Sequence, residues 1–128
     1  MVIEKGMERY AIELKYPKNG MYPEEMYEFL RDICFMEQVK KSGFISTYAL
    51  TYVNDKLFYS GTATRVPYSI FRNQSILIES GTYNKPTGDH QTTQSLEISG
   101  EYSTSWRIPT ASWIDNKAIS RYYFIAIK

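Results

Sequence analysis

The side chains that most often perform catalysis are scarce in this sequence. The chain has one cysteine, Cys34, and one histidine, His90, whereas a zinc site takes about three or four ligands from cysteine, histidine and carboxylates. We therefore expect no structural zinc site, and no acidic loop spacing suggests a site for a harder cation. A Ser-His-Asp triad would have to use His90 with its sequence neighbour Asp89, and adjacent residues rarely orient each other as the triad requires.

The remaining catalytic arrangements fail on geometry or surroundings. Cys34 falls beside the apolar stripe of an expected helix, where a cysteine is usually inert packing. Glu97 and Glu101 share one face of an expected strand, but four residues of strand rise separate them by ~13 Å, more than the ~5–10 Å of a glycosidase pair. Neither glycine-rich phosphate motif is present. The sequence thus favours a non-catalytic protein over an enzyme and predicts no cofactor.

A different chemistry is concentrated between Gly81 and Trp113, where aromatic side chains stand among eleven serine and threonine residues. Aromatic rings offer stacking faces, hydroxyls offer adaptable donors and acceptors, and an arginine offers a fork for phosphate or carboxylate. Such a mixture can bind a sugar, a nucleobase or a nucleotide. The predicted ligand-binding residues are Tyr83, Tyr102, Trp106, Arg107, Thr110 and His90.

The same stretch also fits a purely structural role. Strand alternation puts Trp106 and Arg107 on opposite faces, unless the strand twists or ends there, as Pro109 would allow. Aromatic, serine and threonine residues are also the ordinary core and surface residues of a small sheet. His90 lies in the polar loop 84–94, and such a loop is more often a surface connection than a binding element.

We expect a binding protein that holds a small nucleotide-like or sugar-like ligand in this aromatic, hydroxyl-rich stretch. The alternative is a protein-interaction module, such as an inhibitor of a cellular enzyme, with the same aromatics on an open face. An unfamiliar hydrolase or transferase is the third hypothesis. Tyrosine supplies 12 of the 128 residues, and its enrichment at interfaces favours recognition. The high tyrosine content also allows a homo-oligomer, which could form through an edge strand such as 121–127. A concave pocket favours the ligand, and a flat aromatic patch favours a protein partner.

The elements that position these residues follow from hydrophobic spacing. Residues 9–16 alternate bulky apolar side chains with small or charged ones, which predicts a strand with one buried face. Residues 23–41 begin with a proline, carry acids in the first turn and lysines in the last, and so predict a helix. The apolar residues at helical spacing within it are Met26, Phe29, Leu30, Ile33 and Met36.

The rest of the chain predicts strands. Residues 45–66 predict a hairpin that turns at Asn54-Asp55, so that Leu50 faces Tyr59. Three further strands are expected at 75–83, 94–108 and 121–127, the longest one bent at Gly100. The fold class is therefore α+β, with a single N-terminal helix packed on one face of a mostly antiparallel sheet of about five to six strands.

Length and charge set further limits. The 128 residues match one domain, 1–128. The 15 basic residues nearly cancel the 14 acidic ones, which argues against non-specific nucleic-acid binding. The first ten residues do not resemble a signal peptide, and no apolar run approaches the ~20 residues of a membrane span. We therefore expect a cytoplasmic protein without membrane contacts.

Overall fold

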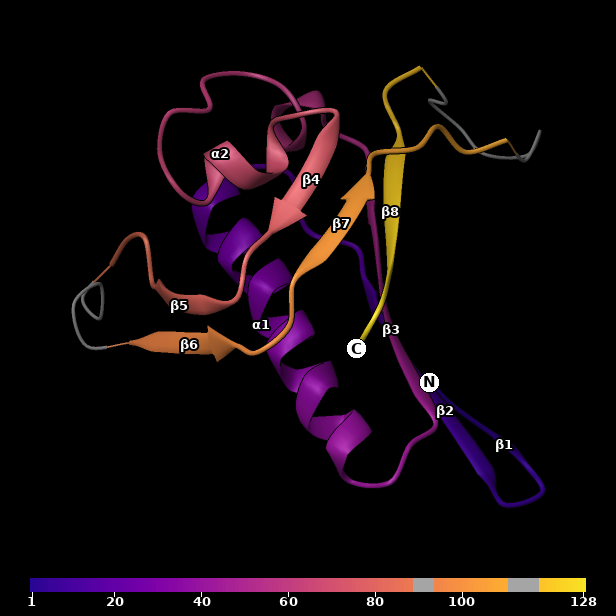
Figure 1. The fold of residues 1–128 in the computed structure, drawn as a ribbon. Helices are drawn as coiled ribbons and strands as arrows, with labels where there is room; N and C mark the ends of the chain where they lie inside the picture. Colours follow the sequence, from indigo (N-terminus) through magenta and orange to yellow (C-terminus); the bar gives the residue numbers. More distant parts are fainter. Residues whose placement is uncertain (89–93, 111–117) are drawn as a thin grey trace.

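The computed structural model describes residues 1–88, 94–110 and 118–128. One long helix lies at the centre of the strands, which surround it on more than one side (Figure 1). In chain order the elements are β1 (Val2–Lys5), β2 (Glu8–Lys15), α1 (Tyr22–Lys41), β3 (Ser46–Val53), the 3-10 helix η1 (Lys56–Phe58), α2 (Tyr68–Phe71), β4 (Ser75–Ile78), β5 (Gly81–Asn84), β6 (Ser95–Ile98), β7 (Tyr102–Ser105) and β8 (Arg121–Ala126).

The strands form three sheets. The largest has the order β1-β2-β3-β8, and the other two are the pairs β4-β7 and β5-β6. Only β2 and β3 pair in parallel, because α1 connects them as a crossover; the other pairs are antiparallel. The predicted α+β class with a mostly antiparallel sheet is confirmed. The helix lies in the N-terminal part of the chain after two strands, one more than predicted, and the strands are divided among three sheets.

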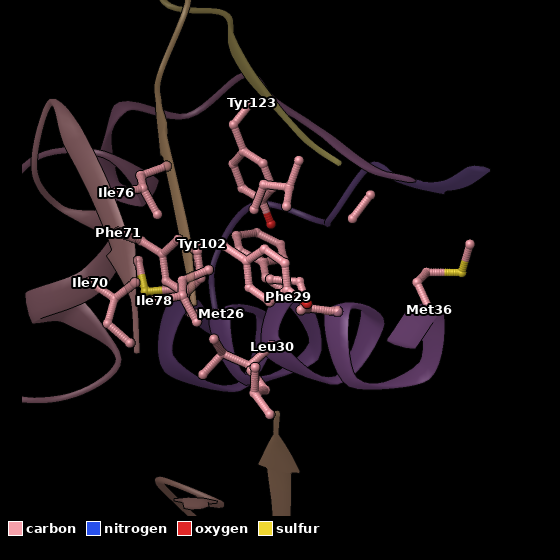
Figure 2. Packing of buried hydrophobic residues seen from close by; sticks show 14 of the residues in the cluster. Met26, Phe29, Leu30, Met36, Ile70, Phe71, Ile76, Ile78, Tyr102 and Tyr123 are labelled. Atoms are coloured by element: carbon pink, nitrogen blue, oxygen red, sulfur yellow. The ribbon is translucent and has the colours of Figure 1, made fainter. Parts of the chain in front are cut away.

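Helix α1 forms where the sequence predicts it. Its first turn holds Pro23 and two glutamates and its last turn two lysines, which complement the helix dipole. The chain enters it through Met21, in the left-handed region at φ 48°. All five apolar residues of the predicted stripe are at most 2% exposed. Figure 2 shows four of them, Met26, Phe29, Leu30 and Met36, on the core side of the helix.

Strand β2 buries the face opposite to the one that the alternation of residues 9–16 suggests. Ala11 of β2 and the inward residues of β3 are buried against α1. These inward residues are small, since the bulky helix side chains already fill the space between helix and sheet. The larger side chains point away from α1 and form what we call the outer face: Tyr10, Ile12, Leu14, Tyr16, Tyr48, Leu50, Tyr52, Tyr122 and Phe124.

The predicted hairpin over residues 45–66 is wrong. Leu50 pairs with Leu14 and Phe124 instead of Tyr59. Asp55 does not form a hairpin turn, because its side chain accepts a hydrogen bond from the Leu57 amide and caps η1. The chain then turns inward and buries Phe58 completely. Burial of this aromatic ring replaces the strand pairing that alternation suggested.

The expected strands 75–83 and 94–108 are each broken into two. The first divides before Gly81, whose φ of 145° is strained for other residues. The second divides at Gly100, as predicted, where a Cβ atom would lie 2.6 Å from the Tyr102 hydroxyl oxygen. Each long segment therefore contributes one strand to each small sheet. Strand β8 forms at Arg121–Ala126, close to the expected range.

A buried carboxylate fixes the bend at Gly100. Glu37 of α1 is only 5% exposed. Its Oε1 accepts the Ser99 amide at 2.9 Å, and its Oε2 accepts the Gly100 amide at 2.8 Å and the Tyr102 hydroxyl at 2.6 Å. Burial and the hydrogen bond to Glu37 raise the pKa of Tyr102, which keeps this donor protonated. One helix side chain thus holds the segment that joins β6 to β7.

The Glu37 contacts give a first test. We expect Glu37→Gln to lower the free energy of unfolding by about 2–4 kcal/mol, because the amide NH₂ cannot accept the hydrogen bonds that one oxygen now receives. Tyr102→Phe removes one donor and should cost only about 1 kcal/mol. Urea denaturation measures both. Equal and negligible losses would mean that Glu37 does not hold the bend.

A second buried carboxylate of α1 is less well satisfied. Asp32 is 8% exposed, and the Lys15 Nζ atom lies 3.5 Å from its Oδ2. That oxygen accepts no hydrogen bond from the described residues. Burial raises the pKa of Asp32 from 3.8 to about 6, against the opposing effect of Lys15. The folded protein therefore binds this proton more tightly than the unfolded chain, and ionised Asp32 weakens the fold.

The destabilisation by ionised Asp32 should be absent below pH 3.8, the ordinary pKa of the carboxyl, and complete above about pH 6, its pKa in the folded protein. We expect Asp32→Asn to raise the free energy of unfolding by about 1–2 kcal/mol at neutral pH, and to give no gain near the ordinary pKa. Glu28→Gln, at a half-buried position of the same helix, is the matched control and should not raise the free energy of unfolding at neutral pH, since it removes an ion pair with Arg31. Denaturation curves across this pH range provide the measurement. A lower free energy of unfolding for Asp32→Asn at neutral pH would contradict the expectation.

Candidate ligand-binding hollow

A hollow with a volume of about 840 Å³ opens among the described residues. It opens between the loop that leads to α2 and the strand β5, which lie on the same side of α1 (Figure 1). Three segments line it: Thr62 with residues 64–68, residues 82–87, and Pro23 at the start of α1. We call this space the hollow.

Arg72 holds the first wall in place. Its Nε donates to the Leu57 carbonyl at 2.8 Å and its Nη1 donates to the Thr62 carbonyl at 3.2 Å. The guanidinium also lies 4.0 Å from the centre of the Tyr68 ring, within cation–π range. Gly61 lets the arginine pass, since a Cβ atom there would lie 3.0 Å from Nη1. The loop is thus fixed by a residue that is not part of the lining.

The second wall begins with β5. The Tyr83 hydroxyl donates to the Glu79 carbonyl at 2.5 Å, and burial raises the pKa of this hydroxyl above its ordinary value. The Lys85 amide donates to the Gln94 carbonyl at 2.9 Å, which extends the β5-β6 pairing beyond the strand ends. Thr87 donates to Glu24 of α1 at 2.5 Å. These contacts attach both ends of the wall to the rest of the fold.

The lining combines hydroxyl groups, two tyrosine rings and two cations. Among the described residues that line it, there is no aspartate, glutamate, histidine or cysteine. Within the described ranges, neither Arg65 nor Lys85 has a carboxylate oxygen within 4.0 Å. Lys85 also borders a neighbouring hollow of about 390 Å³ whose wall includes three glutamates of α1. Of these two cations, Lys85 therefore borders the glutamates of the neighbouring hollow, and Arg65 does not.

Of the six predicted ligand-binding residues, the structure places only Tyr83 at the hollow. Tyr102 and Trp106 are core residues, 4% and 3% exposed. Tyr102 donates to Glu37, and the Trp106 indole donates to the Phe71 carbonyl at 2.6 Å. Their polar atoms are satisfied inside the protein, so these two rings do not line a pocket with Tyr83.

The other three predicted residues lie elsewhere. Arg107 is exposed on the opposite face from Trp106, as strand alternation predicts, and borders a small hollow of about 380 Å³ with Tyr122 and Phe124. Thr110 is exposed at the end of a described range. His90 lies outside the described residues. The structure therefore does not bring the five described residues of this set together.

The sequence-based prediction missed Arg65, Tyr68 and Lys85. It identified the loop after β5 as a place for contacts but selected His90, although Lys85 lies in the same loop. Arg65 and Tyr68 were assigned to the end of a hairpin strand and the connection after it. A signal existed in the run Thr62–Tyr68, which places two threonines, an arginine, a proline and a tyrosine close together.

Fold and hollow together define an α+β protein with an open recess lined by hydroxyl, aromatic and cationic side chains. No known protein family, curated protein or solved structure shows a significant similarity to this chain. Across the described ranges, no group of three or more histidine, cysteine or acidic residues could hold a metal ion. No helix in the described part of the chain is long and apolar enough to span a membrane.

The close approach of Gly61 and Arg72 can be tested directly. Gly61→Ala should lower the free energy of unfolding by about 1–3 kcal/mol, because φ is 125° and the new methyl group would press on Arg72. Gly43→Ala is the matched control: its φ is 114°, but its Cβ would meet nothing within 4 Å. Thermal melts should show the larger loss for Gly61→Ala. Equal losses would mean that the backbone alone requires glycine.

Proposed function

We propose that the protein binds a small anionic, nucleotide-like molecule in the hollow and does not transform it. The observation that carries the proposal is Arg65, which forms no ion pair with the described residues, beside a recess of about 840 Å³ that also presents Tyr68 and Tyr83. This volume lies within the range of ~300–1,000 Å³ that is typical of small-molecule sites.

Each group of the lining has a matching part of such a ligand. The Arg65 guanidinium can bind a phosphate through two parallel hydrogen bonds. The ring of Tyr68 is half-buried and lines the hollow, so its accessible part can contact a base or sugar. The threonine side chains of both walls can donate to or accept from sugar hydroxyls.

A binding role fits the lining better than a catalytic one. General acid–base and nucleophilic catalysis most often use histidine, carboxylate or cysteine side chains, and the lining residues that the structure describes include none of these. The hydroxyl of Tyr83 is already used in a hydrogen bond to a main-chain carbonyl. Arg65 and the threonines can hold a ligand but are poor proton acceptors at neutral pH.

Isothermal calorimetry against nucleotides, cyclic nucleotides, sugar phosphates and neutral sugars tests this function. We expect heat from the phosphate-bearing compounds. Arg65→Ala should weaken binding by about tenfold to a hundredfold, because a charge-assisted hydrogen bond contributes ~1.5–3 kcal/mol. Arg107→Ala is the matched control, since this exposed arginine lies outside the hollow.

Thermal melts run alongside show whether each variant stays folded. Binding of neutral sugars alone would keep the hollow as a site but remove the anionic part of the proposal. No heat from any compound, or an equal loss with Arg107→Ala, would contradict the proposed function.

A further inference from the structure

The outer face of the four-stranded sheet is largely apolar, and in the described part of the chain its side chains are exposed or half-buried. The register places Leu14 beside Leu50, and Leu50 beside Phe124, so that side chains from three strands adjoin. Tyr48 stacks on Phe124 with ring centres 5.1 Å apart. None of these nine residues carries a charge. Charged residues stand at the ends of the same side of the sheet: Glu8 follows the alternation of β2 and pairs with Lys5, and Arg107 pairs with Tyr122. Ordinary monomers rarely expose a continuous apolar patch of this kind.

The exposed area approaches that of a stable interface. A buried aromatic side chain covers about 150–250 Å², so Tyr16 at 64% and Phe124 at 43% exposure leave on the order of 200 Å² in solvent. With Leu14 at 56% and the half-buried residues around it, the face exposes on the order of 600 Å². A standard interface takes ~800 Å² from each partner. Rim residues, such as Ile3 of β1 beside Tyr10, can supply the remainder.

We propose that the outer face is the interface of a homodimer, formed when two copies of this chain pack sheet against sheet. The middle of the face is uncharged and aromatic, so it is best covered by another face of the same kind, and a two-fold axis brings such a face onto itself. Sheets pack face to face at ~10 Å with interdigitated side chains. The net charge of +1 gives two copies little mutual repulsion.

The hydrogen bonds at the edge of β8 favour a dimer that forms through the outer face over one that forms by strand addition at this edge. The edge of β8 is partly occupied, because the Arg107 amide donates to the Tyr122 carbonyl at 2.8 Å and the Tyr122 amide donates back at 2.9 Å. Thr104 donates to the Phe124 carbonyl at 3.1 Å. Strand addition at β8 would break these hydrogen bonds, whereas face packing leaves them intact. The hollow lies on the helix side of the sheet, so dimerisation and ligand binding are separate inferences.

Sedimentation velocity over a wide concentration range tests the dimer. The wild-type chain should have twice its own mass of 15.0 kDa, whereas Leu14→Lys should weaken the dimer by about a hundredfold or more, since a two-fold places both charges in the apolar interface. Leu77→Lys is the matched control: Leu77 is 57% exposed, close to Leu14, but lies on β4. It should leave the dimer unchanged. Phe124→Lys is a second variant, on another strand of the face, and should act like Leu14→Lys.

Circular dichroism at low concentration should show that all three variants fold like the wild type. A wild-type chain that stays at 15.0 kDa throughout overturns the proposal and leaves a different protein as the occupant of the face. A dimer that neither Leu14→Lys nor Phe124→Lys weakens also overturns it, because the interface then lies elsewhere.

Discussion

Burial of one helix on several sides is the constraint on which this fold depends. Helix α1 contacts β2 and β3 of the large sheet, β6 of one small sheet, and both α2 and η1. A two-stranded sheet is not stable in water by itself, so β4-β7 and β5-β6 require the helix and its neighbours as a surface on which to bury Ile76, Ile78 and Ile98. The core seen in Figure 2 therefore belongs to all the sheets at once, with Phe29 among rings from separate segments.

Directional polar contacts then decide how the layers sit on the helix. Glu37 fixes the segment between β6 and β7, and Thr47 of β3 donates to the Met36 carbonyl at 2.9 Å. Trp106 binds the Phe71 carbonyl, which joins the end of β7 to α2. Apolar packing alone tolerates sliding of one layer over another, whereas these buried donors and acceptors lose their partners if the layers shift. The hollow has a defined shape for the same reason, since Arg72 holds its loop.

Local signals predicted the helix and most strand positions, because end charges, proline and helical spacing act within a few residues. The buried face of β2 was not predictable in this way. Alternation shows that two faces differ, but small residues can face a helix while tyrosines face outward, as Ala11 and Tyr10 do.

The hairpin at 45–66 failed because Phe58 packs into the core. The burial of Tyr102 and Trp106 was not predictable for a related reason. Both have the chemistry of ligand contacts, and only long-range contacts with Glu37 and Phe71 show that this chemistry is used internally.

The placement of β8 beside β3 has a consequence for the order in which the fold can form. Strands β1 to β3 and helix α1 are close in sequence and can assemble early, but β3 finds its second neighbour only near the other end of the described chain. Contacts between distant segments close large loops and form slowly. Until β8 arrives, β3 presents an open row of main-chain donors and acceptors beside Tyr48 and Leu50, which is a template for strands of other molecules. Newly made chains are thus most vulnerable to aggregation during this interval, before any native partner covers that edge.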